Sequence, residues 1–178
     1  NLLHVLPECL GELRHLQALD VGRNFFERLP PSLADLPSLR TLDATYNRIC
    51  NLPAFERVPN LQELRVGGNN ISAHIPYALF TKATLTLLMF DSNLYITGTI
   101  PSDPTAWPRG LGRVDFSQTS IDGDLRSFIN LPSLTELFVG QARFSGPLPT
   151  FVGCSSLKHV NFSYNALNGT IPEEWGQL

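Results

Sequence analysis

Residues 16–24, LQALDVGRN, carry two leucines three positions apart, then an apolar residue, then a closing asparagine. The pattern returns six more times, with Val in place of the second leucine in two copies and a closing residue other than asparagine in two. The seven segments are LQALDVGRN (16–24), LRTLDATYN (39–47), LQELRVGGN (61–69), LTLLMFDSN (85–93), LGRVDFSQT (111–119), LTELFVGQA (134–142) and LKHVNFSYN (157–165). Their starts are 23, 22, 24, 26, 23 and 23 residues apart. A period this regular predicts a repeat architecture, with one structural unit in each copy.

The middle of each segment predicts a short strand. In Leu19-Asp20-Val21 apolar and polar residues alternate, as they do in a strand with one buried face. A single copy cannot bury its own apolar face, so successive copies must stack. We therefore expect parallel strands, one from each copy, that share a core with the segments connecting them.

The pattern resembles that of the leucine-rich repeat, whose copies are 20–29 residues long, and the resemblance covers essentially the whole chain. It implies an α/β fold: a curved solenoid with a parallel β-sheet on the concave face and short 3₁₀ or irregular segments on the convex face. We expect one domain over 1–178, with seven strand-bearing repeats and a partial repeat at each end. Because neither end shows a capping module, we also expect flanking repeats or caps in a longer protein.

Five of the seven segments close on an asparagine. In this family these asparagines form a ladder, in which each side chain satisfies backbone groups of the neighbouring turn. The predicted ladder residues are Asn24, Asn47, Asn69, Asn93 and Asn165. The other two segments end in Thr119, which keeps a hydroxyl, and Ala142, which has no polar atom. An unsatisfied buried donor costs about 1–3 kcal/mol, so we expect a water or a local adjustment near Ala142.

The residues that follow the asparagine fall into two classes. The early copies, such as NFFERLPPSL (24–33), are similar to repeats of intracellular signalling scaffolds. The later copies, such as NALNGTIP (165–172), resemble the plant-type repeats of receptor-kinase ectodomains and polygalacturonase inhibitors. The segment NLYITGTIPSDPTAWPRG (93–110) departs most from either form, and we interpret it as a bulged outer loop.

Composition and motifs argue against several functions. The charge of −3 and the lack of a basic cluster argue against nucleic-acid binding, and no apolar run approaches the ~20 residues that span a bilayer. The four histidines have no metal-ligand spacing, and no catalytic or phosphate-binding motif occurs. We therefore expect no enzyme activity, cofactor, metal or membrane insertion. The three cysteines, Cys9, Cys50 and Cys154, are interpreted as buried or part-buried thiols.

Strand alternation also assigns the side chains of the concave face. Most are small or polar, but three apolar residues stand among charged ones near the middle. Such a patch is typical of a binding centre with a charged rim, although scattered exposed apolar residues are common. The predicted contacts for a protein or peptide ligand are Arg65, Leu87, Met89, Asp91, Arg113, Asp115, Glu136 and Phe138.

Three asparagines begin N-x-S/T sequons and are candidate glycosylation sites in a secreted protein: Asn70, Asn161 and Asn168. Random matches to so short a motif are common. We expect a recognition domain at the cell surface or outside the cell. The alternative is an intracellular scaffold or an assembly subunit of a large complex.

Overall fold

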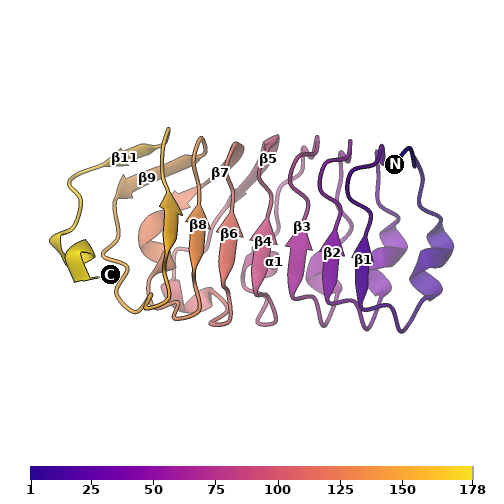
Figure 1. Ribbon diagram of the computed structural model, residues 1–178, viewed down its shortest axis with the longest axis horizontal. Helices are drawn as coiled ribbons and strands as arrows, with labels where there is room; N and C mark the ends of the chain where they lie inside the picture. Colours follow the sequence, from indigo (N-terminus) through magenta and orange to yellow (C-terminus); the bar gives the residue numbers. More distant parts are fainter. Residues whose placement is uncertain (178) are drawn as a thin grey trace.

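The computed structural model describes residues 1–177, and it confirms the predicted solenoid (Figure 1). Each of the seven segments contributes one three-residue strand to a parallel sheet, sheet A. In spatial order the strands are β1 (Ala18–Asp20), β2 (Thr41–Asp43), β3 (Glu63–Arg65), β4 (Leu87–Met89), β6 (Arg113–Asp115), β8 (Glu136–Phe138) and β10 (His159–Asn161). All neighbours pair without a register shift, so equivalent positions of successive repeats lie side by side.

A second parallel sheet, sheet B, was not predicted from the sequence. It runs along the edge of the C-terminal half, beyond the asparagine turns (Figure 1). Its strands are β5 (Asn93–Thr99), β7 (Thr119–Asp124), β9 (Arg143–Pro147) and β11 (Ala166–Asn168). The divergent segment 93–110 supplies β5, and later repeats of the second class supply the other three strands. Gly123 of β7 has a φ of 145°, and a Cβ there would collide with the side chain of Ile100.

Short helical segments cover the side of the core opposite sheet A. They are η1 (Glu8–Glu12), η2 (Pro31–Asp35), η3 (Phe55–Arg57), η4 (Pro104–Ala106), η5 (Leu125–Phe128), η6 (Glu173–Gln177) and the α-helical turn α1 (Tyr77–Phe80). A proline directly precedes or begins several of them, where its fixed φ suits the first turn and its missing N–H costs nothing.

One continuous apolar core lies between the sheet and these segments. Its centre holds large aromatic rings: Trp107 packs on Phe128, with ring centroids 4.7 Å apart, and Phe80 contacts both Trp107 and Phe116. Trp107 is therefore fully packed. The segment expected to be only an outer loop begins as strand β5, and its bulge lies between Asn93 and Thr97.

The asparagines connect successive turns through hydrogen bonds. The amide of Asn47 donates to the carbonyl of Val21 in the preceding repeat, while its Oδ1 accepts from the backbone N–H of Phe26. Asn69, Asn93 and Asn165 bond in the same way.

The adjustment at Ala142 involves the preceding repeat. A ladder asparagine at position 142 would accept a hydrogen bond from the backbone N–H of Ile121. With alanine there, this N–H instead donates to the hydroxyl of Thr119 at 3.3 Å. The same hydroxyl donates to the carbonyl of Phe116 at 2.6 Å. A local threonine therefore replaces one step of the ladder.

Candidate functional site

The eight residues predicted to contact a ligand lie on or directly after four adjacent strands of sheet A. Along the third position of each strand, Arg65, Met89, Asp115 and Phe138 are consecutive partners in register. Along the first position, Leu87, Arg113 and Glu136 are consecutive partners. Asp91 follows β4 by two residues. We call these eight residues the concave patch.

Arg113 connects the apolar and charged parts of the concave patch. Its guanidinium carbon lies 5.5 Å from the ring centroid of Phe138, and its Nη1 lies 2.8 Å from Oε2 of Glu136. Its Nη2 lies 4.0 Å from Oδ2 of Asp115, while its buried Nε has no hydrogen-bond partner among the described residues. Three neighbours on two strands therefore restrict the orientation of the Arg113 side chain.

The other arginine of the patch has a partner that sequence reasoning missed. Nη1 of Arg65 lies 2.5 Å from Oε2 of Glu63, two residues earlier on the same strand. The half-buried side chains of Leu87 and Met89 stand between this ion pair and Arg113. The apolar centre is thus bracketed by two arginines, each already paired with a glutamate.

Two carboxyls of the patch lie in an unfavourable electrostatic environment. Burial raises the pKa of Asp91, and the neighbouring carboxylate of Asp115 raises it further. Oδ1 of Asp91 is buried without a hydrogen-bond partner among the described residues. Burial likewise raises the pKa of Asp115, although the hydrogen bond from the Ser117 N–H opposes this rise. Both carboxyls therefore hold protons more tightly than exposed aspartates do.

The other acidic residues of the face stabilise the backbone. Asp20 and Asp43 are partners in register, as their shared repeat position predicts. Each accepts a hydrogen bond from the N–H two residues further on, at Gly22 and Thr45. Within residues 1–177, no group of three or more His, Cys, Asp or Glu side chains is arranged to hold a metal ion.

The three sequon asparagines are all exposed. Asn70 directly follows a ladder position, Asn161 faces the concave side on β10, and Asn168 ends β11 at the edge of sheet B. The Oδ1 of Asn161 accepts a hydrogen bond from the Ser163 hydroxyl of its own sequon. All three thiols are free, but Cys9 is exposed, so interpreting it as buried or part-buried was wrong.

Sequence reasoning also missed a row of residues along the rim. The residue before each ladder position has a positive φ, between 53° and 66°, and projects from the turn that ends the strand. The row is Arg23, Tyr46, Gly68, Ser92, Gln118, Gln141 and Tyr164. The sequence could have identified this row, because each of its residues directly precedes the last residue of a repeat segment.

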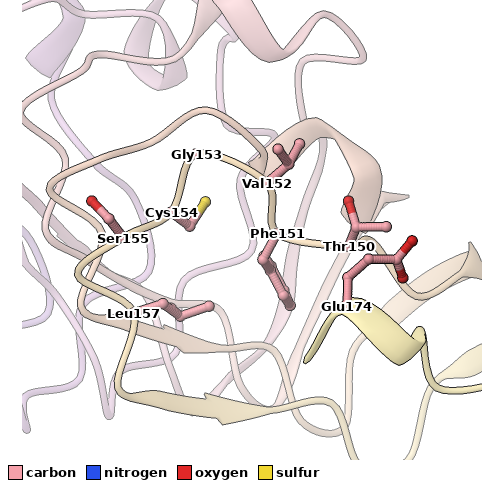
Figure 2. A pocket seen from close by; sticks show the side chains of 8 residues that line it. All are labelled: Thr150, Phe151, Val152, Gly153, Cys154, Ser155, Leu157 and Glu174. Carbon is pink, nitrogen blue, oxygen red and sulfur yellow. The ribbon is translucent and has the colours of Figure 1, made fainter. Parts of the chain in front are cut away.

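A hollow of about 610 Å³ lies far from the concave patch, near the C-terminal end of the solenoid (Figure 2). Residues 150–155, Leu157 and Glu174 line it, with the buried thiol of Cys154 among them. Burial raises the pKa of this thiol, so it is a weak nucleophile. No residue of the concave patch reaches the hollow.

Two family models match parts of the chain. The model described as leucine-rich repeat and WD repeat-containing protein 1, LRR, matches residues 2–79, and the Leucine Rich Repeat model matches residues 156–178. The chain is 27% identical to receptor-like kinase TMK2 of Arabidopsis thaliana over 97% of its own length and 23% of the relative's.

Solved structures agree with these matches. A TDR receptor superposes with a TM-score of 0.88 at 25% identity, over 98% of this chain and 31% of that one. The Arabidopsis receptor kinase HAESA, solved with the peptide hormone IDA and the co-receptor SERK1, superposes with a TM-score of 0.83 at 26% identity. That match covers 94% of this chain and 28% of HAESA.

The chain therefore spans less than a third of each of these three relatives. Among the described residues, no helix is long and apolar enough to cross a membrane. The repeat period, the parallel sheet and these matches lead to one conclusion. The chain is a leucine-rich-repeat protein, similar to the ectodomains of plant receptor-like kinases and receptor-like proteins.

Proposed function

We propose that this chain is a non-catalytic recognition module that binds a protein or peptide partner through the concave patch. One observation carries the proposal. Three half-buried apolar side chains, Leu87, Met89 and Phe138, stand on a face whose other positions are mostly small or polar. Arg65 and Arg113 stand on either side of Leu87 and Met89, Phe138 lies next to Arg113, and each arginine is already paired with a glutamate.

This arrangement suits binding for two physical reasons. Apolar side chains at the centre of a polar surface release water when a partner covers them, and such centres carry most of the energy of an interface. Arg113 loses little further freedom on binding, because Phe138 and Glu136 already hold it. A pre-organised contact of this kind costs less side-chain entropy when the complex forms.

The similar receptors support the proposal. HAESA was solved with a peptide hormone, and the plant peptide hormone receptor RGFR1, solved in complex with RGF2, superposes with a TM-score of 0.75 at 30% identity. We carry that class of ligand to this chain as a proposal, together with a location at the cell surface or outside the cell. We further propose that residues 1–178 act as one recognition domain within a longer protein.

A second candidate is an assembly scaffold inside the cell. It is favoured by the match of residues 2–79 to the model of a WD repeat-containing protein, and by three thiols that form no disulfide within the described residues. Glycans separate the two candidates, since N-linked glycosylation requires passage through the secretory pathway.

The testing experiment compares three variants in affinity capture with the intact protein, followed by direct binding measurements on the partner obtained. Met89→Asp and Phe138→Asp each place a charge in the proposed apolar centre. Val152→Asp makes the same change at an exposed valine away from sheet A and serves as the matched control. We expect the first two to weaken binding by about tenfold or more, and the control to bind like the parent.

Thermal unfolding is measured on the same samples. Because Met89 and Phe138 are half-buried rather than core residues, their replacement is expected to leave the unfolding midpoint nearly unchanged. If both variants fold and bind like the parent, the partner uses another surface and the proposal is wrong.

A further inference from the structure

Two arginines at the N-terminal end of the rim are each stacked on an aromatic ring of the neighbouring repeat. The guanidinium carbon of Arg23 lies 4.7 Å from the ring centroid of Tyr46, and that of Arg48 lies 4.7 Å from the ring centroid of Phe25. Arg23 and Phe25 belong to one turn, and Tyr46 and Arg48 to the next. The two stacks therefore run in opposite directions across a single gap between repeats.

Both rings are held from their other side. The ring of Tyr46 lies over Gly68, where a Cβ would come within 2.7 Å of Tyr46 Cδ1. The ring of Phe25 is stacked on His4, with centroids 5.5 Å apart and planes 20° from parallel. Each guanidinium thus rests on a supported ring, which limits the orientations its plane can take.

Neither guanidinium has a partner for its N–H groups. Within residues 1–177, Arg23 and Arg48 form no ion pair, and their side chains donate no hydrogen bond. By contrast, Arg65, Arg113 and Arg126 are each paired with a carboxylate.

The aspartates of β1 and β2 accept hydrogen bonds from their own turns and form no ion pair with either arginine. Asp20 accepts from the N–H of Gly22, and Asp43 accepts from both the N–H and the hydroxyl of Thr45. Both Arg23 and Arg48 are exposed. Their free N–H edges are therefore open to solvent rather than compensated by a neighbouring side chain.

We propose that Arg23 and Arg48, the rim arginine pair, bind two carboxylates of an extended acidic segment in a partner protein. A guanidinium offers a planar fork of donors that matches a carboxylate in a bidentate pair. Arg23 directly precedes the ladder asparagine of its turn and Arg48 directly follows that of the next turn, and the two stacks lie across the same gap between repeats. In an extended Glu-x-Glu segment the two acidic side chains lie on the same face, about 7 Å apart, so one short segment presents two carboxylates to the same surface.

This site is separate from the concave patch, whose residues begin on β3. The rim arginine pair projects from the turns after β1 and β2. The two sites also differ in chemistry, because the arginines of the patch are paired internally and those of the rim are free.

The test measures binding of a fluorescein-labelled peptide, acetyl-Gly-Glu-Ala-Glu-Gly, to the full chain by fluorescence polarisation at low ionic strength. Peptides with a single glutamate, and free inorganic phosphate as competitor, form the other arms. We expect saturable binding of the two-glutamate peptide, about tenfold tighter than the single-glutamate peptide, because the second glutamate adds a second charge-assisted pair. Inorganic phosphate is expected to compete only weakly, since it offers one anionic group where the peptide offers two carboxylates.

Lysine variants distinguish bidentate hydrogen bonding by the guanidinium groups from attraction by positive charge alone. Arg23→Lys and Arg48→Lys keep the charge but lose the fork and the stacking, and each is expected to weaken binding at least about fivefold. Arg57→Lys, at an exposed arginine without a stacked ring, is the matched control and is expected to bind like the parent. The proposal would be overturned if both rim variants bound the peptide as tightly as the parent does. It would also be overturned if binding to the parent did not saturate, or if phosphate competed as strongly as the same peptide without the label.

Discussion

The guanidinium of Arg113 lies over the ring of Phe138, with Cζ 5.5 Å from the ring centroid. The two residues belong to adjacent strands, β6 and β8, and Phe138 lies two residues beyond Glu136, the register partner of Arg113. The same guanidinium reaches Glu136 and approaches Asp115, so one side chain connects the apolar and acidic parts of the concave patch. Removing this guanidinium would take a contact from each of the three neighbouring side chains.

We expect Arg113→Gln to lower the free energy of unfolding by about 1 kcal/mol, since the ion pair with Glu136 and the contact with Phe138 are lost. The figure is modest because 35% of the Arg113 side chain is exposed and solvent screens the pair. Urea denaturation measures the change, with Arg57→Gln as an exposed, unpaired control. A loss no larger than that of the control would show that Arg113 contributes nothing to stability.

The raised pKa of Asp91 predicts a pH dependence with a definite sign. Between its ordinary value of 3.8 and the higher value in the folded protein, the folded state binds a proton that the unfolded chain releases. The contribution of this carboxyl to stability is therefore fully present below pH 3.8, and it is lost as the pH rises through the higher pKa of the folded protein. Because Asp91→Asn removes the cost of the charge, we expect its stability relative to the parent to improve from acidic to neutral pH.

Asp103 provides a control of opposite sign. The N–H and hydroxyl of Thr105 donate to its carboxylate and lower its pKa below 3.8. Its stabilising contribution is present above 3.8 and is lost as pH falls through the lowered value, so Asp103→Asn is expected to be least stable relative to the parent at neutral pH. Denaturant titrations over the same pH range compare the two variants. If the difference in unfolding free energy between variant and parent changed with pH in the same direction for both variants, the environment described for Asp91 would be wrong.

The ladder asparagines are expected to differ in energetic weight. Asn93 is fully buried, donates to three carbonyls and accepts from the N–H of Ile71. Asn165 makes equivalent bonds but is partly exposed. Each replacement by alanine is expected to cost about 1–3 kcal/mol, with Asn93→Ala the more costly. Chemical denaturation ranks them against Asn70→Ala, an exposed asparagine beside the ladder.

Glycopeptide mapping of protein from its natural source tests the sequons. If the protein is secreted, we expect Asn168 to carry a glycan, because it is exposed at the edge of sheet B and its acceptor residue is Thr170. A glycan on Asn161 would cover that end of the concave face and confine a partner to the middle repeats. Finding Asn70, Asn161 and Asn168 all bare would favour the scaffold over the receptor-like function.

The sequence by itself determined the repeat, the strand positions and the side chains that face outward, because period and alternation depend only on local spacing. Residues such as Leu64 and Arg65 fall on opposite faces of their strand wherever the repeat is placed. The asparagine positions followed from the same period, and the structure adds the bonds that each one makes.

Only the tertiary structure decided what lies across the gaps between repeats. Sheet B forms because the segments after the turn run extended and side by side, and a single copy carries no sign of that neighbour. Cation–π contacts such as Arg113 with Phe138, or Arg23 with Tyr46, join residues 23–25 positions apart in sequence. Their geometry depends on rotamers chosen by packing between adjacent turns, which the spacing of residues along the chain does not specify.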